Sequence, residues 1–261
     1  MGVMQTALER VVVAGSELEF FRIPARSRAL PSLVFLHEGL GSAALWRGFP
    51  SSLAERTGCE AIVYSRGGNG FSTALHEPRS VGYMHDEALD VLPELLERLD
   101  VKDPVLIGHS DGASIALIYA AQHPGAVRGL VLEAPHLFVE ELSLRSIAAI
   151  RSEYETTDLR ARMARYHAEV DATFYGWNDV WLSPEFRAWN IESYAADVRA
   201  PVFAVQGIDD EYGTTLQLER LAQLAPAKVD RLLPADCKHA PHRDRPALVE
   251  SAVAAWIGER A

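Results

Sequence analysis

The sequence contains little cysteine and has less positive than negative charge. Cys59 and Cys237 are the only cysteines among 261 residues; two are too few for a disulfide framework, and free thiols suit a reducing cytoplasm. Lys and Arg number 25 against 36 Asp and Glu, which gives a formal net charge of −11. Nucleic-acid binding relies on clustered Lys and Arg. The charge balance therefore argues against that class of partner.

Long apolar runs are also missing. No stretch approaches the roughly 20 apolar residues that a membrane-spanning helix needs. The N-terminal residues show no basic segment followed by a long apolar core, the pattern of a signal peptide. The histidines and acids match no metal-binding spacing such as H-E-x-x-H. We therefore predict a cytoplasmic protein with no membrane contact, no metal and no cofactor.

The sequence does contain a repeated alternation of apolar runs and amphipathic segments, within a length that suits one large α/β domain. A hairpin over residues 10–14 and 17–23 is predicted first, and buried strands follow at 32–37, 59–65, 105–107, 127–132, 201–206 and 228–233. Helices are predicted at 44–57, at 81–99 with a kink or boundary at Pro93, at 114–122, at 214–224 and from 245 or 246 to 258. This order predicts a mostly parallel sheet with helices on both faces.

Residues 135–198 interrupt the alternation. They contain no strand-like run, and helices are predicted at 142–152 and 158–170. Aromatic residues concentrate in this part of the chain: Tyr154, Tyr166, Phe174, Tyr175, Trp177, Trp181, Phe186, Trp189 and Tyr194. Aromatic walls suit an apolar ligand pocket, so Trp177 and Trp181 are candidate substrate contacts; the alternative is that the rings only form the small core of an insertion. We predict a core at 1–134 and 199–261 with an inserted helical cap at 135–198.

The stretch PVLIGHSDGASIALIYAA, residues 104–121, is the most informative one. A short apolar run precedes Gly108-His109-Ser110-Asp111-Gly112, and apolar residues at helical spacing follow, which is the order strand, sharp turn, helix. The pentapeptide is the only G-x-S-x-G in the chain, and it matches the strained turn that presents a nucleophilic serine. Glycines are needed there because the strand and helix backbones come close together. The alternative is that Ser110 is an ordinary helix N-cap.

A serine nucleophile needs a histidine base, and the histidine needs a carboxylate that fixes its tautomer. Both candidates follow later predicted strands: Asp209 or Asp210 comes first, and His239 or His242 follows the last strand. The carboxyl ends of parallel strands meet at one edge of a sheet. We therefore expect an acid and a histidine to lie near Ser110, and the joint occurrence is far more specific than the pentapeptide.

With nucleophile, acid and base in that chain order, the sequence resembles the α/β-hydrolase fold family over nearly its whole length. Residues 37–41 (HEGLG) are similar to the family's His-Gly-x-Gly loop. Residues 66–72 (RGGNGFS) are similar to its D-x-R-G-x-G-x-S loop without the leading Asp. The resemblance implies the family's fold and a serine-hydrolase type of site.

The resemblance also bears on the choice of acid and base. The family's G-x-x-D loop coincides with residues 207–210, which favours Asp210 over Asp209 as the acid. His239 is preferred to His242 because it lies nearer the end of the last strand, although Lys238 stands where the family usually has glycine. His109, beside the nucleophile, is expected to be structural.

Two backbone N–H groups are further implied as donors to a developing oxyanion. One belongs to Asp111, the residue after the nucleophile, and the other to Gly39, with Leu40 as the alternative. The sequence departs from the family pattern by placing Glu38 where glycine is usual and an acid at position 111. One interpretation is that Asp111 favours the positive helix N-terminus and Glu38 points elsewhere. The other is that they help to bind a cationic or hydroxylated substrate, so Glu38 and Leu40 are candidate substrate contacts.

We predict a serine hydrolase that acts on a small, partly apolar ester through Ser110, His239, Asp210 and an acyl-enzyme. A C–C bond hydrolase, an amide hydrolase or a cofactor-free perhydrolase would use the same residues. A ligand-binding module on the same scaffold is a hypothesis of a different class, and the off-pattern Glu38 and Lys238 are its only support. The oligomeric state is left open.

Overall fold

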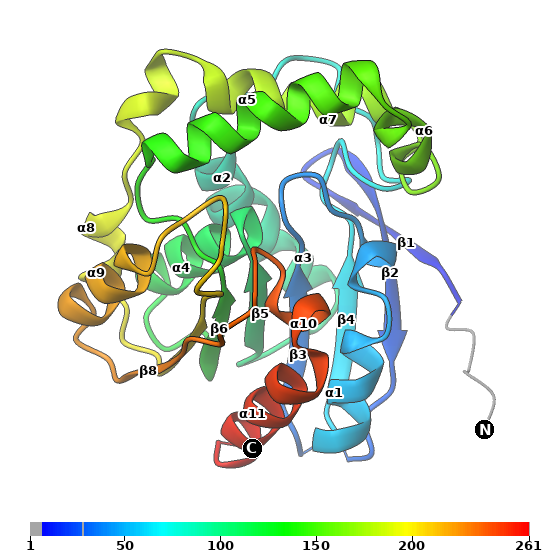
Figure 1. Ribbon diagram of the computed structural model, residues 1–261. Helices are drawn as coiled ribbons and strands as arrows, with labels where there is room; N and C mark the ends of the chain where they lie inside the picture. Colours follow the sequence, from blue (N-terminus) through cyan, green and yellow to red (C-terminus); the bar gives the residue numbers. More distant parts are fainter. Residues whose placement is uncertain (1–6, 28, 261) are drawn as a thin grey trace.

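The computed structural model describes residues 7–27 and 29–260. Its centre is an eight-stranded sheet with the order β1-β2-β4-β3-β5-β6-β7-β8 (Figure 1). In chain order the strands are β1 (Glu9–Val13), β2 (Ser16–Ile23), β3 (Ser32–Leu36), β4 (Glu60–Tyr64), β5 (Val105–His109), β6 (Gly129–Glu133), β7 (Val202–Val205) and β8 (Val229–Leu232). β3 to β8 pair in parallel, whereas β2 is antiparallel to both β1 and β4. The predicted mostly parallel sheet and N-terminal hairpin are confirmed.

Helices cover both faces of the sheet, as predicted (Figure 1). One face carries η1 (Ala43–Trp46), α1 (Phe49–Thr57) and α11 (Pro246–Gly258), and the other carries α2 (Tyr83–Asp86), η2 (Glu87–Val91), α3 (Leu92–Arg98) and α4 (Asp111–Gln122). The remaining helices are α5 (Glu141–Thr156), α6 (Leu159–Met163), α7 (Val170–Leu182), η3 (Glu185–Ala188), α8 (Glu192–Ala195), α9 (Leu216–Leu224) and α10 (Pro241–Asp244).

The side chains of β3 explain why its sequence is a continuous apolar run. Leu33 and Phe35 pack in the apolar cluster that includes α1 and α11. Val34 and Leu36 pack in the cluster that includes α3 and α4. Successive side chains of a strand point to opposite faces, and all four are fully buried. A strand covered on both faces therefore favours apolar side chains at successive positions.

Two predicted helices are interrupted at prolines. The segment 44–57 forms η1 and α1, separated by Arg47 at φ 53°, because Pro50 in the first turn of α1 has no N–H for a continuous helix. The segment 81–99 divides into α2, the π-helical η2 and α3. The predicted boundary at Pro93 is confirmed, since Pro93 lies in the first turn of α3 and cannot donate to the preceding turn.

The helix predicted at 158–170 is confirmed only for α6 and is wrong for the residues that follow. α6 ends at Met163, and α7, which was not predicted, begins at Val170. Between them, the Nδ1 of His167 accepts a hydrogen bond from the Gly70 N–H over 3.0 Å, and its Nε2 lies 3.1 Å from the Leu40 carbonyl oxygen. These contacts to a distant part of the chain hold residues 164–169 out of a helix.

The cap helices, by which we mean α5, α6 and α7, lie together across one edge of the sheet, at the top of Figure 1. Ser110, which follows β5, and His239, in the loop after β8, share a cavity with residues of α5 and α7. The carboxyl ends of these parallel strands therefore face the cap helices. Within the described ranges, no helix is long and apolar enough to cross a membrane. The division of the chain into core and cap at 135–198 stays a prediction.

Candidate active site

Strand β5 and helix α4 meet in a sharp turn at Ser110, which has φ 53° and ψ −117°. A Cβ atom on Gly112 would lie 1.9 Å from the Leu36 carbonyl oxygen, and one on Gly108 would lie 2.4 Å from the carbonyl oxygen of Gly112. Only glycine permits such a close approach of two backbones. The side chain of Ser110 makes no capping hydrogen bond to α4. The alternative interpretation of Ser110 as an ordinary N-cap is therefore wrong.

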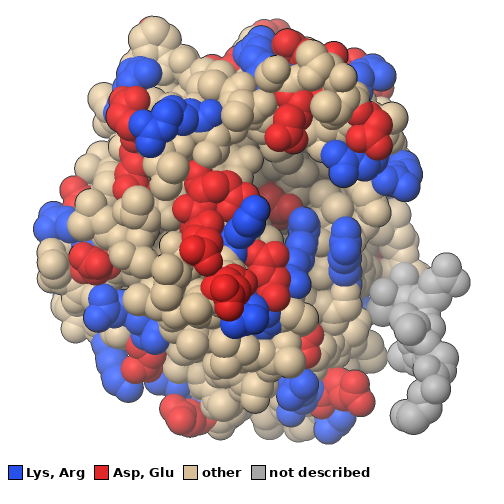
Figure 2. All heavy atoms as spheres, viewed as in Figure 1, with Lys and Arg blue, Asp and Glu red and all other residues tan. Residues whose placement is uncertain are grey.

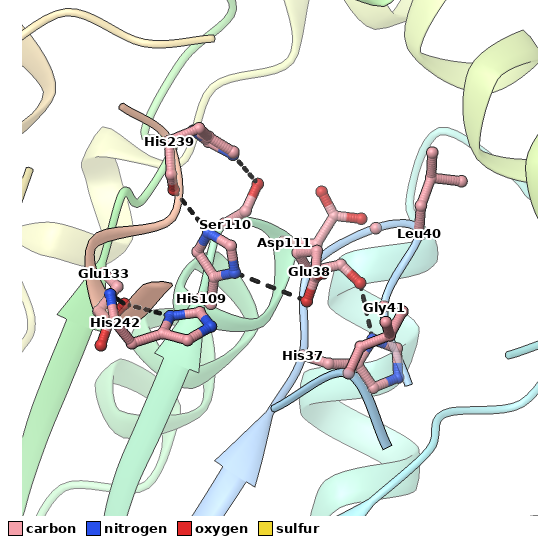
Figure 3. Close-up of polar contacts among 12 residues, drawn as sticks. His37, Glu38, Leu40, Gly41, His109, Ser110, Asp111, Glu133, His239 and His242 are labelled. Atoms are coloured by element: carbon pink, nitrogen blue, oxygen red, sulfur yellow. Dashed lines mark hydrogen bonds and ion pairs between the residues drawn. The ribbon is translucent and has the colours of Figure 1, made fainter. Parts of the chain in front are cut away.

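The structure brings the three predicted catalytic side chains into contact, and Figure 3 shows Ser110 beside His239. Ser110 Oγ lies 2.9 Å from His239 Nε2. On the other side of the ring, Nδ1 lies 2.9 Å from each carboxylate oxygen of Asp210. Asp209 is exposed and takes no part in these contacts. Ser110 is thus within hydrogen-bond reach of a histidine that is itself held by a carboxylate.

Asp210 is fixed by its own loop. Its Oδ1 accepts hydrogen bonds from the N–H groups of Tyr212 (2.7 Å) and Gly213 (3.3 Å), and the side chain of Gln206 contacts its other oxygen. Burial raises the pKa of Asp210, but the charge and hydrogen bond of His239, together with the Tyr212 N–H, outweigh burial and bring this pKa below its usual value. An ionised Asp210 requires a proton on His239 Nδ1, which leaves the Nε2 lone pair facing Ser110.

His242, the other candidate base, lies away from Ser110 in a second acid–histidine pair. Its Nδ1 is 2.7 Å from Glu133 Oε2, and its backbone N–H donates to the same oxygen over 3.2 Å. Both side chains are almost completely buried, and the His242 ring packs against Trp46 and Phe49. These contacts connect the loop before α11 to the end of β6, so the pair stabilises the loop that carries His239.

The loop at residues 37–41 holds its carbonyl groups away from Ser110. The Glu38 carbonyl accepts a hydrogen bond from Arg66 Nη2 (2.9 Å) and lies 2.6 Å from His37 Nδ1. Asn69 Nδ2 donates to the carbonyls of Gly39 and Gly41, each over 3.0 Å. A trans peptide points its N–H opposite to its C=O. The N–H groups of Gly39 and Leu40 therefore point to the side opposite Arg66 and Asn69.

The N–H groups predicted as oxyanion donors have no acceptor in the described part of the structure. Among the described residues, the N–H groups of Gly39, Leu40 and Asp111 donate no hydrogen bond. Asp111 is the first residue of α4, whose leading N–H groups have no intrahelical acceptor. Gly39 and Leu40 line the same cavity as Ser110. The arrangement provides free backbone donors on two sides of the serine.

The cavity above Ser110 has a volume of about 220 Å³. Its apolar wall comes from the cap helices and the 37–41 loop, through Leu40, Ile147, Ile150, Trp177 and Trp181. Its polar wall contains Glu38, His109, His136, Tyr212, His239 and Arg243. On the face seen in Figure 2, the surface is hollowed beneath the cap helices, with acidic and basic side chains at the rim. The four candidate substrate contacts, Glu38, Leu40, Trp177 and Trp181, all line this cavity.

The two off-pattern acids occupy different environments. The Asp111 carboxylate accepts a 2.5 Å hydrogen bond from Tyr83 Oη, lies 3.9 Å from Arg66 Nη2, and is not part of the cavity wall. Glu38 does line the cavity, between His109 and Arg243. A joint role of the two acids in binding a substrate is therefore excluded by the placement of Asp111.

Sequence reasoning missed three polar residues of the cavity. The Tyr212 ring lies 4.7 Å from that of His239, centroid to centroid. His136 lies just after β6, with its ring 5.7 Å from that of His239, and Arg243 follows four residues after His239. His136 could have been found from the sequence, because it lies beyond the end of a strand. Arg243 could not, because the sequence does not show which way its side chain points. In residues 7–27 and 29–260, no group of three or more His, Cys, Asp or Glu side chains is arranged to hold a metal ion.

Comparison with known proteins defines the class. The sequence model of the alpha/beta hydrolase fold matches residues 31–175, which is more than half of the chain. The chain therefore belongs to the alpha/beta hydrolase fold family.

Individual relatives are distant. The sn-1-specific diacylglycerol lipase ABHD11 of Mus musculus is 31% identical over 103 residues, which are 40% of this chain and 32% of that protein. The proline iminopeptidase of Lactobacillus delbrueckii subsp. bulgaricus is 26% identical over 194 residues, 70% of this chain and 65% of that protein. The matches thus span less than two thirds of either relative. The crystal structure of proline iminopeptidase from Mycobacterium smegmatis has a TM-score of 0.74 at 20% identity, with 97% of this chain and 98% of that chain covered, a likeness of fold.

Proposed function

We propose that this protein is a serine hydrolase that acts on a small, partly apolar ester. The supporting observation is the continuous contact from Asp210 through His239 to Ser110 Oγ, at the wall of a cavity with apolar and polar sides. A volume of about 220 Å³ lies below the roughly 300–1,000 Å³ of typical ligand pockets. This size favours a small substrate. A cytoplasmic location remains part of the proposal.

The first half of the reaction forms an acyl-enzyme. His239 Nε2 takes the proton of Ser110 as Oγ attacks the carbonyl carbon. The carbonyl oxygen gains negative charge and accepts hydrogen bonds from the N–H groups of Asp111 and Gly39, with Leu40 as the alternative donor. His239 then passes its proton to the leaving group, and the C–O bond of the ester breaks. Asp210 stabilises the imidazolium throughout.

The second half repeats these steps with water. Water occupies the place of the departed alcohol and gives a proton to His239 Nε2 as its oxygen attacks the acyl carbon. The same N–H groups bind the second oxyanion. The bond to Ser110 Oγ breaks, His239 returns the proton to Oγ, and the carboxylic acid leaves.

Turnover of p-nitrophenyl acetate by the Ser110→Ala variant tests the proposal. We expect kcat/KM to fall by at least about 10³-fold, because no other group in the cavity replaces the nucleophile. Ser152→Ala, a change on the exposed face of α5, is the matched control and should retain full activity. Equal turnover by Ser110→Ala and the wild-type protein would contradict the proposal.

Amide hydrolysis is the second candidate function. The relative that matches the larger share of this chain is named a proline iminopeptidase, and the same three residues would cleave an amide bond with His239 protonating the leaving amine. Comparison of kcat/KM for proline p-nitroanilide and for p-nitrophenyl esters decides between the two. A preference for the anilide would make the amide the substrate class.

A further inference from the structure

Arg243 is the only Lys or Arg side chain in the wall of the cavity, within the described part of the chain. It lies in the short helix α10, four residues after His239, and its N–H bonds to the Ala240 carbonyl. The segment from His239 to Arg243 therefore brings both the proposed base and a permanent positive charge to the same cavity. None of the steps proposed above uses this charge.

The contacts of Arg243 leave much of its guanidinium open. Nη2 donates to the Leu45 carbonyl over 3.1 Å and to Glu38 Oε1 over 3.3 Å. A guanidinium has five N–H donors, and the three on Nε and Nη1 have no partner among the described residues. The side chain is about one-third exposed. Arg243 is thus anchored through one nitrogen and presents its other donors to an incoming group.

Glu38, the acid beside Arg243, has His109 as a second neighbour on its other carboxylate oxygen. His109 Nε2 lies 2.7 Å from the His239 carbonyl, so Nε2 carries a proton. His109 Nδ1 lies 3.6 Å from Glu38 Oε2 (Figure 3), and a proton there would complete an ion pair. Burial lowers the pKa of His109, but Glu38 outweighs burial and the pKa lies above its usual value. Glu38 is therefore contacted from two sides, by His109 and by Arg243.

The apolar wall also contains a donor that is sealed from the cavity. Trp177 Nε1 is buried without a hydrogen-bond partner. The indole lies against Gly39, where a Cβ atom would come within 2.1 Å of Nε1. An indole N–H can only donate. Arg243 thus supplies the open donors at the cavity, while the carboxylate of Glu38 is already contacted on both oxygens.

We propose that Arg243 is a specificity-determining residue that makes the cavity select substrates carrying a carboxylate group. The open Nε and Nη1 donors of Arg243 match an anionic acceptor, and a guanidinium forms strong charge-assisted hydrogen bonds with carboxylates. The rest of such a substrate contacts Ile147, Ile150 and Trp181. The substrate class is then a short, partly apolar ester of a dicarboxylic or carboxyl-bearing compound. This inference rests on the proposed serine hydrolase function.

Two pairs of esters test it, since the carboxylate could belong to either half of the substrate. Mono-p-nitrophenyl glutarate is compared with its methyl ester, and 4-acetoxybenzoate with its methyl ester. In at least one pair we expect the acid to have the higher kcat/KM. Arg243→Gln should lower that acid-to-ester ratio about 10- to 100-fold, and Arg243→Lys should lower it less. Arg47→Gln, an exposed arginine beside Arg243 that does not line the cavity, should leave the ratio unchanged.

The outcomes separate this inference from the proposed function. If Ser110-dependent hydrolysis occurs but neither acid is preferred, or if Arg243→Gln leaves the ratio within twofold, the inference is overturned and the hydrolase function stands. If no ester is hydrolysed, binding of glutarate to the Ser110→Ala variant, measured by calorimetry, replaces turnover. Binding that Arg243→Gln abolishes supports the carboxylate site, and no binding overturns it.

Discussion

His136 is a buried histidine at the wall of the candidate site, and it destabilises the folded protein at low pH. Burial, followed by repulsion from His239, lowers the pKa of His136 to about 3. In the unfolded chain its pKa is close to 6.5. Between these values the unfolded chain binds a proton that the folded protein does not bind. His136 therefore lowers the free energy of unfolding as the pH falls from 6.5 toward 3.

We predict that His136→Gln reduces the acid sensitivity of the fold. From pH 7 to pH 5 the wild-type protein should lose about 2 kcal/mol of unfolding free energy through this residue alone, at about 1.4 kcal/mol per pH unit below 6.5. The variant should lack that part of the slope, whatever its own stability at pH 7. Urea denaturation at both pH values measures the slope, with the exposed His76→Gln as control. Equal slopes for wild-type and His136→Gln would show that His136 is protonated in the folded state.

At the scale of elements, the conformation of the loop after β3 depends on hydrogen bonds from the loop after β4. Asn69 Nδ2 holds the carbonyls of Gly39 and Gly41, while Asn69 Oδ1 accepts a 2.8 Å hydrogen bond from Arg79. Asn69 does not line the cavity. It acts as a positioning residue, because rotation of the Gly39–Leu40 peptide would turn a proposed oxyanion donor away from Ser110.

We predict that Asn69→Asp lowers kcat for p-nitrophenyl acetate by at least about tenfold while KM changes by less than about threefold. The carboxylate keeps the acceptor for Arg79 but has no donor for the two carbonyls, and donors to an oxyanion act mainly in the transition state. Asn190→Asp, on the exposed surface, is the control and should leave both constants unchanged. A rise in KM at constant kcat would instead assign Asn69 to substrate binding.

The elements differ in how far the sequence could predict them. Strands such as β3 and β5 are continuous apolar runs because both faces are covered, so local sequence is sufficient. The end of α6 depends on His167, whose partners Gly70 and Leu40 are about a hundred residues away, and no local pattern contains that information. The sequence could predict that Ser110, Asp210 and His239 lie close together, because each residue follows the end of a predicted parallel strand. It could not give the direction of Arg243, which depends on side-chain packing around α10.

At the scale of the whole molecule, the candidate site exists only when the sheet is complete. Ser110 follows a central strand, Asp210 follows β7, and His239 follows the edge strand β8. His239 is 129 residues from Ser110 and 29 from Asp210 in the sequence. The parallel sheet brings the carboxyl ends of these three strands to one side, beneath the cap helices (Figure 1). Residues of α5 and α7 line the cavity there. The central claim is that this arrangement turns Ser110 into a nucleophile.

Covalent labelling at neutral pH tests that claim most directly. A fluorophosphonate reacts with a serine only when the hydroxyl is activated by a neighbouring base. Intact-mass spectrometry of the wild-type protein should show a single phosphonate adduct, located at Ser110 by peptide mapping. The adduct should be absent from Ser110→Ala and at least about 10²-fold slower to form in His239→Ala, while His242→Ala, if folded, should label at Ser110. A wild-type protein that stays unlabelled, or that is labelled at another residue, would contradict the account.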